Sequence, residues 1–172
     1  GRGSLVLIGG EPGIGKTHLI TALLEEARRR GAYTSIGHCY EGEGAPPYSP
    51  FLETLDYASR NVPRNAFRHA LGDSAAEVAR LMPELRQIFP DIPAPLELPP
   101  EQHRRVLFHA YREFVRRAAA STPLVSVMED LHWADEPSLL LLQHLAQSAG
   151  GTATLMIGTY RDVELDVSRP FA

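Results

Sequence analysis

The sequence predicts an α/β fold with a mostly parallel central sheet that is covered by helices. Two observations carry this prediction: short apolar runs alternate with segments of helical periodicity, and glycines or prolines stand at the connections between them. The chain has 172 residues, the length of one domain or slightly more. Its 44% hydrophobic and 22% charged residues are ordinary values for a globular protein, so disorder of the whole chain is excluded.

The first part of the chain is predicted to form a strand, a loop, a helix and a second strand. Residues 4–9 form a short apolar run bounded by glycines, which is typical of a strand buried on both faces. Residues 16–30 have helical periodicity and end in three arginines before Gly31, a favourable helix stop. A second strand is predicted over 33–38, and the Gly- and Pro-rich segment 41–50 is predicted to be a loop.

The middle of the chain is predicted to be helical, with a proline-rich interruption. Ser49 is expected to cap a helix that has Pro50 in its first position. Ser74 and Glu77 fit a capping box for another helix, which a following proline should end. Because five prolines lie between residues 90 and 100, the segment 90–100 cannot be regular helix or interior strand and is predicted to be a stiff connector.

The last part of the chain is predicted to alternate helix and strand twice. Residues 101–120 have the apolar spacing of an amphipathic helix, and 124–128 form a third apolar strand. A leucine-rich helix is expected to begin at 135–138 and to end near Ser148, before a pair of glycines. Residues 154–160 form the fourth predicted strand.

A phosphate-binding motif lies between the first predicted strand and the first predicted helix. The motif has the pattern G-x-x-x-x-G-K-[ST], and its position between strand and helix is the context that supports it. It consists of Gly10, Glu11, Pro12, Gly13, Ile14, Gly15, Lys16 and Thr17. The next residue, His18, is included among the nucleotide-binding candidates. A structural glycine turn without a ligand is the alternative.

The residue types of this motif suit a nucleotide. Glycines allow successive backbone N–H groups to point inward around phosphate oxygens at the positive end of a helix. Lys16 is the only lysine in a chain with 17 lysines and arginines, and it would place a compact positive charge over the β- and γ-phosphates. The hydroxyl of Thr17 is a candidate ligand of Mg²⁺.

Three further candidates follow predicted strands. The strand at 124–128 leads into Glu129 and Asp130, and the carboxyl ends of parallel strands are where such folds bind ligands. Glu129 could serve Mg²⁺, and Asp130 could orient or deprotonate an attacking water. Arg161 follows the last strand and could contact the γ-phosphate, thereby distinguishing ATP from ADP; an ion pair with Asp162 is the structural alternative.

The composition also limits the partners. A net charge of −4 makes direct nucleic-acid binding by this chain unexpected, and no apolar run is long enough for a membrane span. The single cysteine, Cys39, suits a reducing compartment, and a cytoplasmic location is expected. A buried packing role is expected for its side chain.

Several sequence blocks together resemble a known family. The blocks are the phosphate loop, Cys39 to Tyr48, Glu129-Asp130-Leu131-His132-Trp133-Ala134-Asp135, and Gly158-Thr159-Tyr160-Arg161. They resemble the AAA-like ATPase domains of bacterial signal-transduction ATPases with numerous domains (STAND), which occur in large LuxR-type transcription regulators and beside some adenylyl cyclases. The resemblance covers nearly the whole chain and implies that residues 1–172 are the core of one P-loop ATPase domain taken from a larger multidomain protein.

The resemblance assigns a fold and roles. It implies a three-layer P-loop NTPase with strand order 5-1-4-3-2, of which this chain need not contain the fifth strand. Lys16 and Thr17 would be the Walker A pair, Glu129 the magnesium-associated Walker B acid, Asp130 the water-orienting acid and Arg161 the sensor-1 residue. Many relatives have aspartate where this chain has Glu129, so slow hydrolysis is expected.

The expected function is an ATP-binding and slowly hydrolysing switch domain of a signal-transduction or transcription regulator, with ATP or ADP and Mg²⁺ as ligands. Its expected partners are the nucleotide and the other domains of its parent chain, one of which could bind DNA. Formation of a homo-oligomer is a further possibility. Two alternatives remain: a small-molecule phosphotransferase of the same fold, and a non-catalytic interaction module. The phosphotransferase needs an arginine-rich lid, for which Arg60, Arg64, Arg68 and Arg80 are the candidates.

Overall fold

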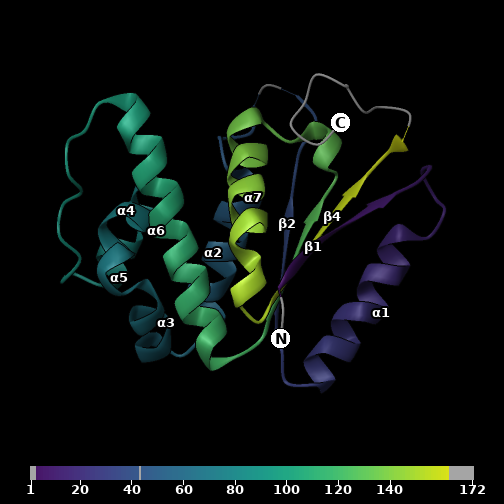
Figure 1. The fold of residues 1–172 in the computed structure, drawn as a ribbon, viewed down its shortest axis with the longest axis horizontal. Coiled ribbons are helices and arrows are strands. Elements are labelled where there is room, and N and C mark those ends of the chain that lie inside the picture. The colour runs from purple at the N-terminus through teal and green to yellow at the C-terminus, as the bar shows by residue number, and fades with distance from the viewer. Residues whose placement is uncertain (1–2, 43, 163–172) are drawn as a thin grey trace.

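A computed structural model describes residues 3–42 and 44–162 of the chain. Its centre is a four-stranded sheet in which every neighbouring pair of strands is parallel (Figure 1). The strands are β1 (Ser4–Gly9), β2 (Tyr33–His38), β3 (Leu124–Glu129) and β4 (Thr154–Tyr160). All four coincide with predicted strands, except that β3 continues one residue further, to Glu129.

The strand order is β1-β4-β3-β2. This order confirms that the last strand lies between the phosphate-loop strand and the Glu129 strand. No fifth strand joins the sheet within residues 3–42 and 44–162, so β1 is an edge strand there, with Val6 44% exposed. The register aligns Gly9 with Tyr160 and His38 with Glu129, and the carboxyl ends of all four strands therefore meet at one edge of the sheet.

Helix α1 (Lys16–Arg29) covers one face of the sheet, at the right of Figure 1. Ile20 and Leu24 of α1 are buried against Val125, Val127 and Ile157 of the sheet, an apolar layer that fixes the helix behind the phosphate loop. The helix ends one residue before the predicted position. Its stop is as predicted, since Gly31 has a φ of 81°, which glycine adopts without strain.

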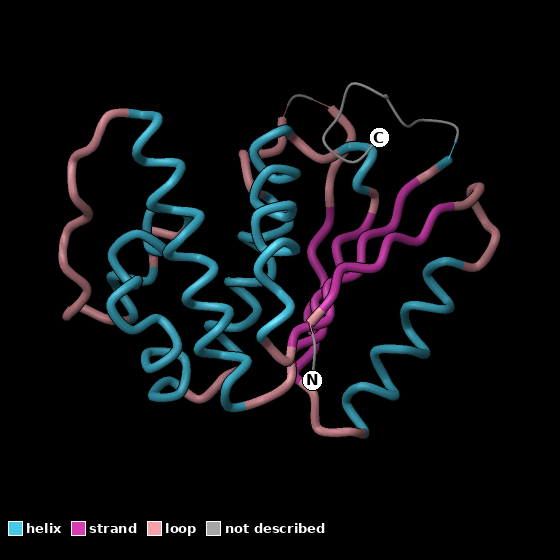
Figure 2. Tube along the Cα trace, in the orientation of Figure 1, coloured by secondary structure: helices cyan, strands magenta, loops and turns pink. Residues whose placement is uncertain are grey.

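The other helices lie on the opposite face of the sheet, which makes three layers (Figure 2). They are α2 (Ser49–Asn61), α3 (Arg64–Leu71), α4 (Ala75–Leu81), α5 (Leu85–Ile88), α6 (Pro100–Ser121) and α7 (Glu136–Ser148). The larger core cluster of the described residues lies among these helices and includes Phe51, Leu71 and Leu141. Residues 92–99 contain neither helix nor strand, and Pro100 opens α6.

Two helix starts differ from their predictions: the N-cap of α2 is not Ser49, and Ser74 is the N-cap residue of α4 but forms no capping box. Tyr48, with a φ of 65°, is the N-cap of α2, so Ser49 and Pro50 are its first two residues. Ser74 precedes α4 but caps no backbone N–H; its hydroxyl accepts a hydrogen bond from Arg117, and Glu77 pairs with Arg80 instead of closing a capping box. At Ser74 the hydrogen bond from Arg117, a tertiary contact, replaces the local cap.

The start of α7 agrees with the sequence. Asp135 is its N-cap and accepts hydrogen bonds from the backbone N–H of Ser138 at 2.8 Å and from the Ser138 hydroxyl at 2.6 Å. Among the described residues, no helix has the length and apolar character that crossing a membrane would require.

Candidate nucleotide-binding site

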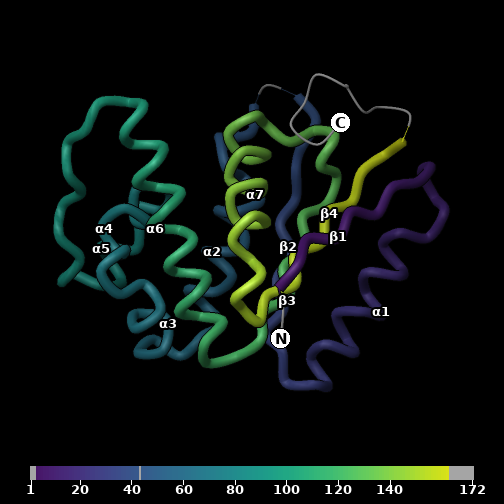
Figure 3. The backbone as a smooth tube through the Cα atoms, viewed as in Figure 1, coloured from purple at the N-terminus to yellow at the C-terminus, as the bar shows by residue number. Residues whose placement is uncertain are grey.

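The phosphate loop connects β1 to α1, and the chain turns back there at the carboxyl edge of the sheet (Figure 3). Gly13 and Gly15 have φ angles of 80° and 106°, a region that other residues enter only with strain. A Cβ atom at either position would meet no other heavy atom within 4 Å, so the backbone conformation alone explains the requirement for glycine.

The amino end of α1 is open to an anion. Gly15 is its N-cap, no side chain forms a capping hydrogen bond there, and the first turn has no acidic residue. The orphan N–H groups of a first turn and the helix dipole together attract phosphate. The helix therefore presents unused donors next to the loop.

Lys16 lies across the loop. Its Nζ donates to the carbonyl oxygen of Gly10 at 2.6 Å and to that of Glu11 at 3.0 Å. Because an ammonium group has three donors, one remains for a phosphate oxygen. The exposed side chains of Thr17 and His18 follow at the start of α1. The ammonium group of Lys16 thus ties the first residues of the loop to the start of α1.

Asp130 has an unusual backbone conformation directly after β3. Its φ of 60° and ψ of 47° lie in the left-handed region, which is uncommon for a residue other than glycine. The backbone N–H of Asp130 donates to Oγ1 of Thr159 at 3.1 Å, and Thr159 is only 2% exposed. A buried hydroxyl on β4 therefore holds the chain in the turn that follows the two acids.

Glu129 has a neighbour that the sequence analysis missed. Nε2 of His38 lies 3.4 Å from Oε2 of Glu129, and Nδ1 of His38 lies 2.8 Å from Oε2 of Glu53. The backbone N–H of His38 also donates to Glu53 at 3.0 Å. The imidazole thus lies between the two carboxylates. The side chain of Glu129 is 17% exposed and therefore reaches solvent.

Arg161 follows β4 at the same edge. Its guanidinium carbon lies 4.9 Å from the ring centroid of Trp133, a cation–π contact. Trp133 belongs to the short 3₁₀ turn Leu131–Trp133 that follows Asp130. A Cβ atom on Gly158 would lie 2.3 Å from Cδ1 of Leu131, so this glycine allows the turn to pack closely on β4.

The donor set at this edge suits a magnesium ion. Mg²⁺ prefers one or two carboxylates together with hydroxyl, water and phosphate oxygens. The hydroxyl of Thr17 and the carboxylate of Glu129 are both oxygen donors that reach solvent. Among residues 3–42 and 44–162, no three His, Cys, Asp or Glu side chains form a cluster that could hold a metal.

Cys39 is buried beside the acidic residues. Burial raises the pKa of its thiol to about 12, and the charges of Asp135 and Asp130 add to the increase. Because only a thiolate is a good nucleophile or metal ligand, Cys39 acts as a small apolar side chain in the core, where it is 3% exposed.

The four candidate lid arginines contact their own helical layer. Arg60 pairs with Asp56 at 3.0 Å, and Arg68 pairs with Asp91 at 2.6 Å. The other two behave in the same way: Arg80 pairs with Glu77, and Arg64 donates to the carbonyl oxygen of Ile88. Each is thus engaged on helices α2 to α5 or the adjoining segments, and they do not form one cluster at the phosphate loop.

Sequence reasoning missed His38, Glu53 and Thr159. His38 and Thr159 lie at the ends of strands, a position that could have indicated them. Glu53 lies in the first turns of α2, and only the packing of that helix on β2 brings it to the site.

The chain is similar to several known proteins. Over 196 aligned positions the chain is 27% identical to an uncharacterized protein of Rhizobium meliloti (strain 1021), and the match covers 99% of this chain. The chain spans only 18% of the length of that relative. Among solved structures, it is similar to the genome packaging NTPase B204 from Sulfolobus turreted icosahedral virus 2 in complex with ATP-gammaS. That match has a TM-score of 0.38 and 12% identity and covers 94% of this chain and 67% of the other.

Residues 1–157 match the family described as AAA ATPase domain, which is most of the chain and includes the phosphate loop, the two acids and most of β4. With the parallel sheet and the glycine cradle at its carboxyl edge, the match leads to one conclusion. The chain belongs to the AAA ATPase domain family.

Proposed function

We propose that the chain is a nucleotide-operated switch domain of a signal-transduction or transcription regulator of the LuxR type. It binds ATP with Mg²⁺ and hydrolyses it slowly, and the ATP and ADP states favour different arrangements of the parent protein. The observation that carries this proposal is the meeting of the phosphate loop, the acids after β3 and Arg161 after β4 at one edge of the sheet.

Each residue has a role in the proposal. The cradle is formed by Gly10, Glu11, Pro12, Gly13, Ile14 and Gly15. Lys16 places its charge over the β- and γ-phosphates and donates its remaining N–H to one of their oxygens. Thr17 and Glu129 would hold Mg²⁺, which supplies positive charge for the developing negative charge on the phosphates. Asp130 orients a water molecule and accepts a proton from it. The water oxygen bonds to the γ-phosphorus, and the bond between that phosphorus and the ADP oxygen breaks.

Arg161 distinguishes the two nucleotides in this proposal. Its stacking on Trp133 ties the cation to the turn that contains Asp130. A guanidinium that contacts the γ-phosphate stabilises the ATP state and loses that contact after hydrolysis. This contact stabilises the ATP state relative to the ADP state. Because Arg161 follows β4 and stacks on the turn after β3, its movement would shift both elements.

The first test measures ATP affinity by calorimetry for the chain and for Lys16→Ala. Removing a charge-assisted hydrogen bond costs about 1.5–3 kcal/mol, so the affinity should fall about 10- to 150-fold. Arg29→Ala is the matched control, because it removes an exposed cation at the other end of the same helix. Unchanged affinity in Lys16→Ala would contradict the phosphate-loop assignment.

The second test separates a switch from a phosphotransferase. We expect inorganic phosphate and ADP to form in equal amounts without any acceptor. The engagement of Arg60, Arg64, Arg68 and Arg80 within their own layer favours hydrolysis over transfer under a lid. ADP formation that requires a small-molecule acceptor would overturn the switch, and an absence of ATP binding would favour an interaction module.

A further inference from the structure

A large cavity lies between the sheet and the helices on the face opposite to α1. Its volume is about 750 Å³. Native interiors leave few voids larger than a water molecule, whereas pockets for small molecules typically measure about 300–1,000 Å³. Side chains from α2, α3, α6 and α7 and from strands β2, β3 and β4 form its walls. The cavity has the size of a ligand site.

The cavity opens at the edge of the sheet opposite to the phosphate loop. Its exposed lining residues include Asn61, Asn65 and Ser121, which lie at the end of α2, near the start of α3 and at the end of α6. These helix ends lie together at the bottom of Figure 1, where the strands begin. Phe51 and Met128 also line the cavity and are 1% and 4% exposed, so it extends from this mouth into the core.

Two hydroxyl groups in the wall have no partner in the described part of the chain. Both are buried: Oη of Tyr33 at the start of β2 and Oγ1 of Thr154 at the start of β4. Thr154 is 5% exposed as a residue. Burial also raises the pKa of Tyr33, which keeps its phenol protonated and able to donate. Buried hydroxyls normally have hydrogen-bond partners, so this pair is able to donate to an acceptor that enters the cavity.

A third polar feature of the wall explains an irregularity in the sequence. Ser126 interrupts the apolar strand β3, and its hydroxyl lies 3.3 Å from that of Ser35 on β2. Both serines line the cavity. The sheet therefore contributes a strip of hydroxyl groups on this face, whereas the face toward α1 has apolar Val125 and Val127.

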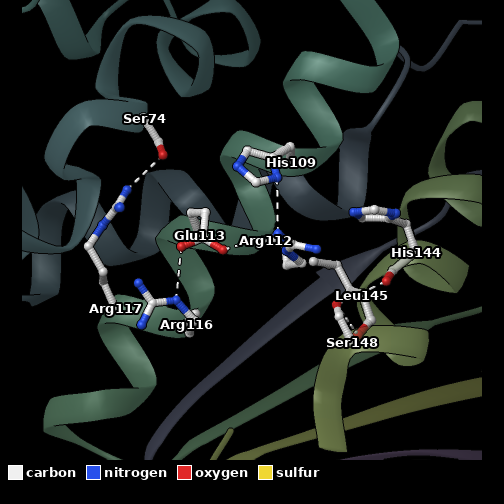
Figure 4. A network of polar contacts seen from close by, with 9 residues as sticks. All are labelled: Ser74, His109, Arg112, Glu113, Arg116, Arg117, His144, Leu145 and Ser148. Atoms are coloured by element: carbon white, nitrogen blue, oxygen red, sulfur yellow. Dashed lines mark hydrogen bonds and ion pairs between the residues drawn. The ribbon is translucent and has the colours of Figure 1, made fainter. Parts of the chain in front are cut away.

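The described wall has no acidic side chain, and most donors of its one arginine are bonded to the protein. Arg117 lines the cavity, but its Nε donates to the carbonyl oxygen of Ala70 at 2.8 Å, and its Nη2 donates to Leu71 and to Ser74 at 2.7 Å each. Figure 4 shows the side chain of Arg117 extended toward Ser74. His69 is exposed at the mouth, and no acidic residue lines the described wall. A cationic ligand would therefore be buried without a counter-ion, and the Nε and Nη2 donors of Arg117 that could meet an anion are already bonded to the protein.

We propose that this cavity binds a neutral, mostly apolar small molecule that has a carbonyl or hydroxyl group, which accepts hydrogen bonds from Tyr33 and Thr154. The proposal is independent of the nucleotide site, because the mouth lies at the other edge of the sheet.

The first experiment uses N-phenyl-1-naphthylamine, a neutral apolar fluorophore, with the 172-residue chain. We expect saturable binding with one fluorophore per chain, and displacement by benzophenone and by diphenylmethane, which differ by one carbonyl group. A typical hydrogen bond should make benzophenone about five-fold the tighter competitor. Absence of saturable binding, or equal affinity of the two competitors, would overturn the proposal.

Variants then locate the site. Thr154→Val keeps the shape of the side chain and removes its hydroxyl, so it should reduce the preference for benzophenone without lowering the unfolding midpoint. Ala118→Phe fills the cavity from α6, whereas Ala120→Phe places the same side chain at an exposed position of that helix outside the lining. We expect fluorophore binding to be lost only in Ala118→Phe.

The cavity-filling variant Ala118→Phe could fail to fold, whereas Thr154→Val keeps the shape of the side chain, so the test does not depend on one variant. Circular dichroism shows whether Ala118→Phe is folded. If it is not, the affinity ratio of benzophenone to diphenylmethane in Thr154→Val decides whether the proposed site is correct. Loss of binding in Ala120→Phe alone, or an unchanged carbonyl preference in Thr154→Val, would contradict the proposed site. A crystal structure that shows Tyr33 and Thr154 bonded only to ordered water would identify a hydrated void instead.

Discussion

The turn at Asp130 offers a sharp test of how the chain positions its acids. Thr159→Val replaces the Oγ1 atom that accepts the Asp130 N–H by a methyl group of the same shape. A buried donor left without a partner costs about 1–3 kcal/mol, and Asp130 keeps a left-handed backbone that already costs about 1–2 kcal/mol. We expect the unfolding free energy to fall by about 1–3 kcal/mol, which lowers the melting temperature by roughly 2–12 °C in a protein of this size.

The same substitution should slow phosphate release, because Asp130 loses the bond that orients its turn. Thr159→Ser is the matched control: it removes a buried methyl group at a cost of about 0.8 kcal/mol and keeps the hydroxyl. Both variants should lose stability in urea titrations, but only Thr159→Val should lose turnover. Wild-type stability and wild-type turnover in Thr159→Val would refute this account of the turn.

Three further substitutions address single features of the site. Asp130→Asn should bind ATP normally, since asparagine tolerates the left-handed backbone. It should release phosphate at least about 100-fold more slowly in a steady-state assay, because the catalytic base is lost. An unaltered rate would assign the base to another group. Arg161→Ala should reduce the ratio of ATP to ADP affinity measured by calorimetry, and an unchanged ratio would mean that the residue is only structural. Gly15→Ala should strain the loop at a φ of 106° by about 1–2 kcal/mol and weaken ATP binding, whereas Gly150→Ala, which has open space and no positive φ, should match wild type in both measurements.

The strands were predictable because their signal is local. Three of them are apolar runs, β2 is a short segment between a helix stop and a loop, and the observed bounds agree with the predicted ones to within one residue. Local signals failed at the starts of α2 and α4, whereas the cap of α7 is as predicted. Tyr48 takes the N-cap of α2 in a left-handed conformation, with its ring in edge contact with Phe108 at 6.4 Å between centroids. Ser74 is bonded to Arg117, 43 residues further along the chain.

The candidate site also has one part that local sequence indicates and other parts that only tertiary packing creates. The phosphate loop is contiguous, so its spacing alone indicates it. The unit of Glu53, His38 and Glu129 comes from α2, β2 and β3, and no sequence spacing reveals it. The cavity is a property of packing, and Ser126 in an apolar strand is its only visible trace in the sequence.

The central claim is that residues 10–17 hold the polyphosphate of a nucleotide, and an amide-resolved NMR titration tests it most directly. On addition of ATP with magnesium, the backbone N–H signals of Gly13, Gly15, Lys16 and Thr17 should shift together and saturate at one nucleotide per chain. In Lys16→Ala the same signals should stay near their free positions at equal nucleotide concentration. Saturable shifts confined to other parts of the sheet, with these four amides unmoved, would contradict the claim.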